Sequence, residues 1–261
     1  VSDEEILTDA GWALSYLTGD AAAELVEFIF ENGVHVRLNE LLSHTDSSIQ
    51  TCALRTIGNL MTGSALETSA LLNAGALTNI RRLIESCDKR GLLKEAAWVL
   101  SNVAAGTEED IEALLDSGLV PILLELVNSS APETKREAAW ALCNAVTGVS
   151  SANLVRRFHK MHVLPALIYA LECPDHKLRE LALDGMECLL RLGAKTGDRS
   201  VGREIEELNG IDQLEALQND PVPSIAKRAT KLLTRYFEVI DDMIMTTTSP
   251  QTNDKQQYVF G

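Results

Sequence analysis

Apolar residues recur at helical spacing along most of the chain. In the segment "KEAAWVLSNVAAG", Val99, Leu100 and Val103 fall on one side of a helix. Trp98 and Asn102 are four residues apart and therefore share a different side of the same helix. The strict alternation of apolar and polar residues that is typical of strands is missing. The pattern predicts an all-α chain.

The same pattern returns at a nearly constant interval. The segment "REAAWALCNAVTG" comes 42 residues later and carries Trp140 and Asn144 in the same positions. Steps of 43, 43, 42 and 44 residues connect the positions in this register, which are Trp12, Arg55, Trp98, Trp140 and Asp184. A helical unit of this length cannot bury its apolar face alone, whereas stacked units can. The spacing therefore predicts an α-solenoid.

A second series of markers keeps the same interval. The glycines of "ENGV", "NAGAL" and "DSGLVP" are Gly33, Gly75 and Gly118. "KMHVLP" holds the matching place without glycine, and "LNGIDQL" restarts the series at Gly210. We expect the Trp-bearing helices to end at Gly106 and Gly148 in the left-handed conformation, and Thr107 to cap the next helix.

These markers predict the organisation of the whole chain. We expect a partial repeat over 1–33, full repeats over 34–75, 76–118, 119–162 and 163–209, a capping repeat over 210–238, and a polar, acidic, disordered tail over 239–261.

Charge limits the class of partner. The formal net charge is −15, which repels nucleic-acid phosphates and favours a basic partner. The simpler alternative is that acidity only aids solubility. No apolar run approaches the roughly 18 residues that a membrane-spanning helix needs, so we expect no membrane partner.

No arrangement of residues indicates catalysis or metal binding. The five cysteines are scattered without a C-x-x-C motif, which favours buried thiols in a reducing compartment. His159 and His162 are three residues apart, but no further ligand completes a metal site, so we interpret them as a surface pair. Gly-rich phosphate loops and nucleophile motifs are missing. We expect no enzyme activity, no cofactor and no metal.

Trp and Asn at this spacing can instead hold a peptide. An Asn carboxamide offers a donor and an acceptor to an extended backbone. Neighbouring Trp rings leave slots that suit Lys or Arg stems, and the carboxylates of Glu95 and Glu137 lie one turn away on the same stripe. In the alternative interpretation, Trp98 and Trp140 are core residues and the Asn side chains bond neighbouring helices.

Four segments carry a family resemblance. "GWALSYLTG", "ALRTIGNLMTG", "KEAAWVLSNVAAG" and "KREAAWALCNAVTG" resemble consecutive armadillo repeats of the importin-α family, including the replacement of Trp by Arg55. The resemblance implies a right-handed superhelical solenoid. It matches the C-terminal half of the family, without the basic segment that binds importin-β and without the repeats of the major signal-binding site.

The resemblance also implies a function. It predicts a nuclear import adaptor that moves between cytoplasm and nucleus and binds Lys/Arg-rich nuclear localisation signals. The residues implied to line its minor site are Arg55, Asn59, Thr62, Thr68, Glu95, Trp98, Ser101, Asn102, Glu137, Trp140 and Asn144. Trp12 and Tyr16 would flank that site. The repeats after about residue 162 resemble the region where the family binds its export receptor and nucleoporins.

A rival function remains open. Armadillo scaffolds of adhesion or signalling type also bind long partner segments through a charged groove. Basic grooves with few Trp–Asn pairs suit acidic partners. An acidic groove lined by a series of Trp–Asn pairs, one from each repeat, suits basic partners, and we call this series the ladder. This chain has the acidic ladder, which favours the import adaptor.

Overall fold

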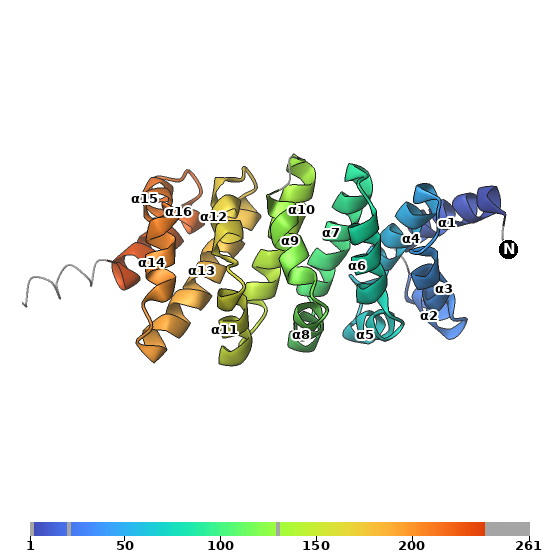
Figure 1. Ribbon diagram of the computed structural model, residues 1–261, viewed down its shortest axis with the longest axis horizontal. Helices are drawn as coiled ribbons and strands as arrows, with labels where there is room; N and C mark the ends of the chain where they lie inside the picture. The colour runs from blue at the N-terminus through green and yellow to red at the C-terminus, as the bar shows by residue number, and fades with distance from the viewer. Residues whose placement is uncertain (1–2, 20–21, 129–130, 238–261) are drawn as a thin grey trace, which may run out of the picture. The chain divides into compact units, whose positions relative to one another are not determined.

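The computed structural model describes residues 3–19, 22–128 and 131–237. Within these ranges the chain forms 16 α-helices and no strand, which confirms the predicted all-α class (Figure 1). The helices are α1 (Glu4–Thr18), α2 (Ala23–Glu31), α3 (Val34–Leu41), α4 (Ser47–Leu60), α5 (Ala65–Asn73), α6 (Ala76–Ser86), α7 (Arg90–Ala104), α8 (Glu108–Asp116), α9 (Leu119–Val127), α10 (Pro132–Thr147), α11 (Ala152–Lys160), α12 (Leu164–Glu172), α13 (His176–Thr196), α14 (Ser200–Glu207), α15 (Gly210–Leu217) and α16 (Pro223–Tyr236). The predicted tail over 239–261 lies outside the described residues, and the division into repeats stays a prediction.

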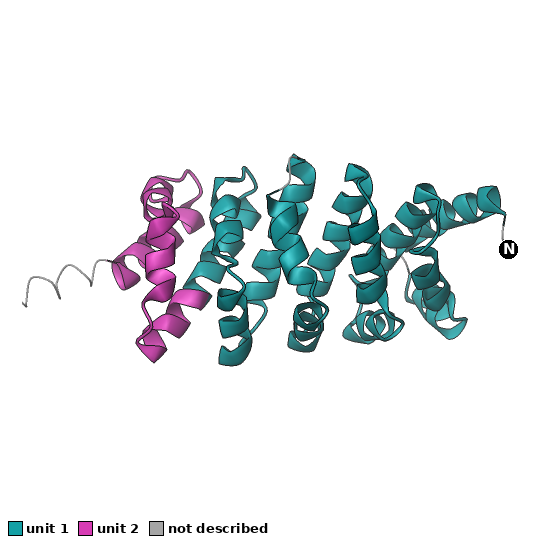
Figure 2. Cartoon of the chain, viewed as in Figure 1, with its two compact units in different colours: residues 1–188 teal, residues 189–261 magenta. Residues whose placement is uncertain are grey.

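The chain forms two compact units, residues 1–188 and 189–261, with the boundary inside α13 (Figure 2). In the first unit α1, α4, α7 and α10 pack side by side in chain order, and these four are called the ladder helices below. Helices α3, α6 and α9 pack on α4, α7 and α10 respectively. The short helices α2, α5 and α8 gather along the lower edge of the view in Figure 1.

The core of the first unit lies between these helices. Val99, Leu100 and Val103 are completely buried, as the apolar pattern predicted. The next ladder helix, α10, buries Ala141 and Leu142 just as fully. Burial of such side chains is the main favourable term in folding. The buried side of each helix therefore leaves the Trp and Asn stripe outside the core centre.

The glycine series marks left-handed turns that start helices. Gly33, Gly75 and Gly118 have φ of 68°, 91° and 74° and precede α3, α6 and α9. In "KMHVLP" the left-handed residue is His162, with φ 56°. The prediction that Gly210 restarts the series is wrong by one position, because Asn209 has φ 57° and Gly210 is already helical. Asn tolerates this conformation better than most residues with a side chain.

The predicted left-handed ends at Gly106 and Gly148 are also wrong. Gly148 has φ −75°, and Gly106 is not among the glycines with positive φ. Both positions are crowded instead. A Cβ at Gly106 would lie 2.6 Å from Asp110 Oδ2, and one at Gly148 would lie 2.5 Å from Ile111 Cδ1. Glycine permits close contact here, and the chain does not need its left-handed freedom.

The predicted cap at Thr107 is confirmed. Its hydroxyl accepts a hydrogen bond from the Asp110 amide at 3.3 Å, and the Asp110 carboxylate accepts one from the Thr107 amide at 2.9 Å. This reciprocal pair is a capping box. It fixes the start of α8 beside the C-terminal end of α7.

The cysteines are mostly buried, as expected. Cys52, Cys143, Cys173 and Cys188 are buried, whereas Cys87 is half-exposed and departs from the prediction. Burial raises the pKa of the Cys143 thiol well above its ordinary value. A neutral, enclosed thiol of this kind is a weak nucleophile.

Glu108 joins α8 to the segment before α11. Its carboxylate accepts hydrogen bonds from the Ser150 hydroxyl at 2.7 Å, the Ser150 amide at 3.1 Å and the Ser151 amide at 3.2 Å. The hydrogen bond from the Ser150 hydroxyl is the main reason that the pKa of Glu108 lies below its ordinary value. The folded chain therefore favours the ionised carboxylate.

This contact predicts a loss of stability in acid. The contribution of Glu108 is complete above its unfolded pKa near 4.5 and disappears as the pH falls through the lower folded pKa. In urea unfolding followed from neutral pH to below pH 4.5, Glu108→Gln should lose less stability than the wild type. Glu109→Gln, at an exposed neighbouring position, should behave as the wild type does. Identical acid losses in all three chains would contradict the assignment.

Candidate functional site

Trp98 and Asn102 of α7 both contact Gly58 of α4. A Cβ at Gly58 would lie 2.3 Å from Cζ3 of the Trp98 ring, so the ring rests directly on the glycine backbone. The Asn102 side chain donates Nδ2–H to the Gly58 carbonyl oxygen at 3.0 Å. We call the Trp and Asn pair of one ladder helix a rung. The two side chains of the α7 rung are thus positioned by one residue of the preceding ladder helix.

The Asn contact repeats along the unit. Asn59 donates Nδ2–H to the Ser15 carbonyl at 2.9 Å, and Asn144 donates to the Ser101 carbonyl at 3.1 Å. Each Asn therefore bonds its helix to the helix before it, as the alternative interpretation of the sequence proposed. Within the described part of the chain, the carboxamide oxygens of these half-buried Asn residues accept no hydrogen bond. In Asn102 and Asn144 one N–H fixes the side chain, while the oxygen and the second N–H stay available. Asn59 also donates to the Thr18 hydroxyl at 3.2 Å, so only its oxygen stays available.

The tryptophans are neither core residues nor fully exposed. Trp12, Trp98 and Trp140 are all half-buried. Because α7 packs on both α4 and α10, Trp98 and Trp140 stand on neighbouring helices. The structure thus brings the two predicted rungs together. Half-buried indoles keep part of an aromatic face for a partner.

Two carboxylates accompany these rungs and both already face basic side chains. Glu95 lies 3.4 Å from Lys94 Nζ and 3.8 Å from Arg55 Nε, and Glu137 lies 3.4 Å from Arg136 Nη2. The side chains of Glu95 and Glu137 are only 14% and 17% exposed. The two carboxylates therefore lie close to the Trp and Asn side chains, and surrounding protein atoms keep most of the solvent away from them.

Arg55 links the flanking residues to the ladder. Its guanidinium lies 5.7 Å from the centroid of the Trp12 ring, within the range of a cation–π contact. The same guanidinium group approaches Glu95 of α7. Tyr16 is 75% exposed, and its ring centroid lies 6.2 Å from that of Trp12. Among the described residues, Trp12 has an internal cation against its ring, whereas Trp98 and Trp140 have none.

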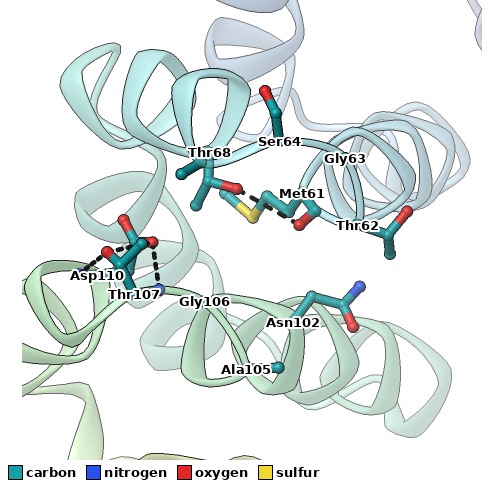
Figure 3. Close-up of a pocket in the computed structure, with 11 residues that line it drawn as sticks. Met61, Thr62, Gly63, Ser64, Thr68, Asn102, Ala105, Gly106, Thr107 and Asp110 are labelled. Atoms are coloured by element: carbon teal, nitrogen blue, oxygen red, sulfur yellow. Dashed lines mark hydrogen bonds between the residues drawn. The ribbon is translucent and has the colours of Figure 1, made fainter. Parts of the chain in front are cut away.

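A pocket of about 320 Å³ opens where α4 and α7 end and α5 and α8 begin (Figure 3). Three predicted site residues line it, namely Thr62, Thr68 and Asn102. The pattern of the sequence did not indicate Asp110, which also lines the pocket and holds Thr107 through its carboxylate. Figure 3 shows Thr62 and Thr68 on one side and Asn102 and Asp110 on the other. The capping box could have suggested Asp110, because it fixes a carboxylate at the end of the ladder helix.

Ser101 and Thr68 are the buried members of the expected site. Thr68 is 3% exposed, and its hydroxyl donates to the Met61 carbonyl at 3.4 Å. Ser101 is buried at 7% exposure, and its hydroxyl donates to the Trp98 carbonyl at 2.8 Å. Its own carbonyl accepts the hydrogen bond from Asn144. Ser101 therefore stabilises the helices that carry the Trp and Asn pairs, and its buried side chain is not presented to a partner.

The described residues also lack the features of a metal site and of a membrane-spanning helix. Over 3–19, 22–128 and 131–237, no three His, Cys, Asp or Glu side chains come together as metal ligands would. In the same ranges no helix has the length and apolarity that crossing a membrane requires.

Known proteins are similar to this chain in sequence and in fold. An armadillo/beta-catenin-like repeat model matches residues 107–147, and an atypical Arm repeat model matches residues 201–251. Importin subunit alpha-1a of Oryza sativa subsp. japonica is 34% identical over 266 residues, which cover 100% of this chain and 50% of the relative. Importin subunit alpha-4 of Arabidopsis thaliana is 34% identical over 268 residues, which cover 100% of this chain and 49% of the relative. The chain belongs to the importin-α family.

The solved structures agree on the fold of this importin-α chain. A designed armadillo repeat protein, YIII(Dq)4CqI, has a TM-score of 0.77 at 23% identity, covering 90% of this chain and 94% of its own. Another designed armadillo repeat protein, solved in complex with the peptide (KR)4, has a TM-score of 0.75 at 24% identity, covering 89% and 94%. The armadillo fold and the family inferred from the four repeat segments are both confirmed. The importin-α chain spans about half the length of the curated relatives it matches.

Proposed function

We propose that this chain is part of a nuclear import adaptor that binds Lys/Arg-rich nuclear localisation signals in extended form. The observation that carries the proposal is the pair of half-buried tryptophans on neighbouring helices, each followed by an Asn with an available carboxamide oxygen. The names of the relatives support the import role.

Each part of the ladder would have its own task. The oxygen and remaining N–H of Asn102 and Asn144 pair with the peptide backbone, since the other N–H is held by a helix carbonyl. Trp98 and Trp140 pack against the stem of a Lys or Arg side chain. Glu95 and Glu137 attract its charge, in exchange for their present basic neighbours.

The pocket at the ends of α4 and α7 would hold a basic head group. Thr62, Thr68 and Asn102 supply polar atoms around it. Asp110 adds a carboxylate, although that charge also serves the amide of Thr107. An ammonium group with three donors suits such a ring of oxygen atoms.

Charge supports a basic partner over the rival scaffold function. Residues 1–188 contain 14 Lys and Arg against 27 Asp and Glu. This excess of negative charge raises the association rate of a cationic peptide and repels an acidic one. Further partners follow the family: we propose an export receptor and nucleoporins at residues after about 162, and movement between cytoplasm and nucleus.

Calorimetric titration with a Lys/Arg-rich peptide tests the function. Wild-type chain should bind it, and Trp98→Ala and Trp140→Ala should each weaken binding about tenfold, as expected for a lost cation–π and stacking contact. Phe28→Ala removes an exposed aromatic ring from α2 and should leave affinity unchanged. A glutamate-rich peptide of equal length should not bind.

Two outcomes would overturn this account in different ways. Equal affinity of the wild type and both Trp variants would remove the site assignment. Binding of the glutamate-rich peptide in place of the basic one would favour a scaffold for acidic partners.

A further inference from the structure

The second unit contains a pocket with a different electrostatic character from the ladder. It has a volume of about 600 Å³ and lies between the end of α13, the start of α14 and the end of α16 (magenta unit in Figure 2). Three arginines line it, namely Arg199, Arg203 and Arg235. A guanidinium group presents a planar fork of donors that matches the oxygens of a phosphate or carboxylate.

The positive charge of this pocket stands out in an acidic chain. Residues 189–237 contain eight Lys and Arg against seven Asp and Glu, whereas the whole chain carries −15. Two acidic residues also line the pocket, Asp198 and Glu206, so the lining side chains carry three positive and two negative charges. One of the two is already engaged, because the Asp198 carboxylate accepts the Ser200 amide at 2.9 Å.

The arginines differ in how they are held. Arg203 is exposed and forms no ion pair within residues 3–19, 22–128 and 131–237. The guanidinium of Arg235 lies 5.4 Å from the centroid of the Tyr236 ring, which limits its range of positions. Arg199 and Arg235 keep contacts of their own, but a guanidinium has five donors and can hold a ligand in addition.

The backbone of α14 adds to the same field. Val201 and Gly202 line the pocket in the first turn of the helix. The side chain of the N-cap residue Arg199 makes no capping hydrogen bond, whereas the Asp198 carboxylate accepts the Ser200 amide. The first turn of a helix carries N–H groups without intrahelical acceptors and a partial positive charge. Gly202 has no side chain to cover this turn, and a Cβ there would have no neighbour closer than 3.9 Å.

We propose that this pocket binds a phosphoryl group carried by a phosphorylated Ser or Thr of a partner protein. Three guanidinium groups exceed what one carboxylate can use, whereas a phosphate monoester presents three acceptor oxygens and nearly two charges. A protein source fits better than a nucleic acid or an anionic membrane. Those extended polyanions are repelled by a chain whose formal net charge is −15, whereas a single phosphoserine brings only one dianionic group.

Solution NMR of the whole ¹⁵N-labelled chain tests the proposal with N-acetyl-O-phosphoserine amide as the probe. The signals of Val201, Gly202 and the arginine Nε–H groups of the pocket should shift and saturate. Arg203→Gln should weaken binding about tenfold, the loss expected for one charge-assisted hydrogen bond. The control is Arg156→Gln, which removes the same charge from an exposed site on α11 and should bind as the wild type does.

Each alternative gives a distinct result. Equal weakening by Arg203→Gln and Arg156→Gln, or shifts scattered over the surface, would overturn the site. Inorganic phosphate that binds as tightly as the phosphoserine probe would overturn the assignment to a phosphorylated protein. So would sedimentation of the chain with phosphatidylinositol-phosphate vesicles while the soluble probe leaves the spectrum unchanged.

Discussion

Replacing Gly58 by alanine should lower the free energy of unfolding by about 1–3 kcal/mol, the usual cost of overpacking a tight contact. The added Cβ would lie within 2.3–2.9 Å of three atoms of the Trp98 ring. Either the ring or α7 must move, and the hydrogen bond from Asn102 to the Gly58 carbonyl must lengthen. Urea unfolding measures the loss.

Gly91→Ala is the matched control for this change. Gly91 lies in the first turn of α7, and a Cβ there would meet nothing within 4 Å. Alanine in a helix restricts the unfolded chain more than glycine does, so Gly91→Ala should be neutral or slightly stabilising. If both substitutions lower the stability equally, the close contact at Gly58 is not the cause.

Asn102→Asp should also destabilise the chain, by about 1–3 kcal/mol, the cost of leaving a buried acceptor without its donor. The substitution keeps the size of the side chain but replaces the N–H that bonds the buried Gly58 carbonyl with an oxygen. Thermal or urea unfolding near neutral pH measures this effect.

Asn73→Asp is the control that separates the loss of the interhelical hydrogen bond from the effect of changing Asn to Asp. Asn73 is exposed at the end of α5, where its side-chain amide contacts the Ser69 hydroxyl at 3.4 Å and no other partner in the described part of the chain. Its replacement should change stability little. A similar loss at both positions would contradict the role of Asn102 as a bond between ladder helices.

Periodicity predicted the helices and the side on which each is buried. Val99, Leu100 and Val103 were assigned to the core from their spacing and are completely buried. Such positions are predictable because the helical period is a local property of the chain. The cap at Thr107 was predictable for the same reason, since its partners lie within three residues.

Contacts between repeats were harder to predict. From the sequence, Gly58 is a residue of low helix propensity, whereas in the structure the Trp98 ring packs directly against it. The bond from Asn102 to a carbonyl 44 residues earlier depends on how two helices pack. The sequence left two roles open for Asn102, namely pairing with a peptide backbone and bonding neighbouring helices. The structure shows the bond between helices and leaves the carboxamide oxygen available for a peptide.

The ends of the ladder helices show the limit of a rule based on residue type. Glycine at Gly106 and Gly148 suggested left-handed ends, but neither residue has a positive φ, and the side chains of Asp110 and Ile111 approach them closely instead. Asp110 was missed for a related reason, because its place in the pocket depends on α4 and α5. Spacing along the chain does not report such contacts.

The tryptophan side chains give the most direct measurement of where a basic peptide binds. The chain has three tryptophans, so an ¹⁵N spectrum has three indole N–H signals. On titration with a Lys/Arg-rich peptide, we expect the signals of Trp98 and Trp140 to shift and saturate together. The Trp12 signal should move less, because the Arg55 guanidinium already lies against that ring. Peptide binding that leaves the Trp98 and Trp140 signals unchanged would contradict the ladder as the binding site.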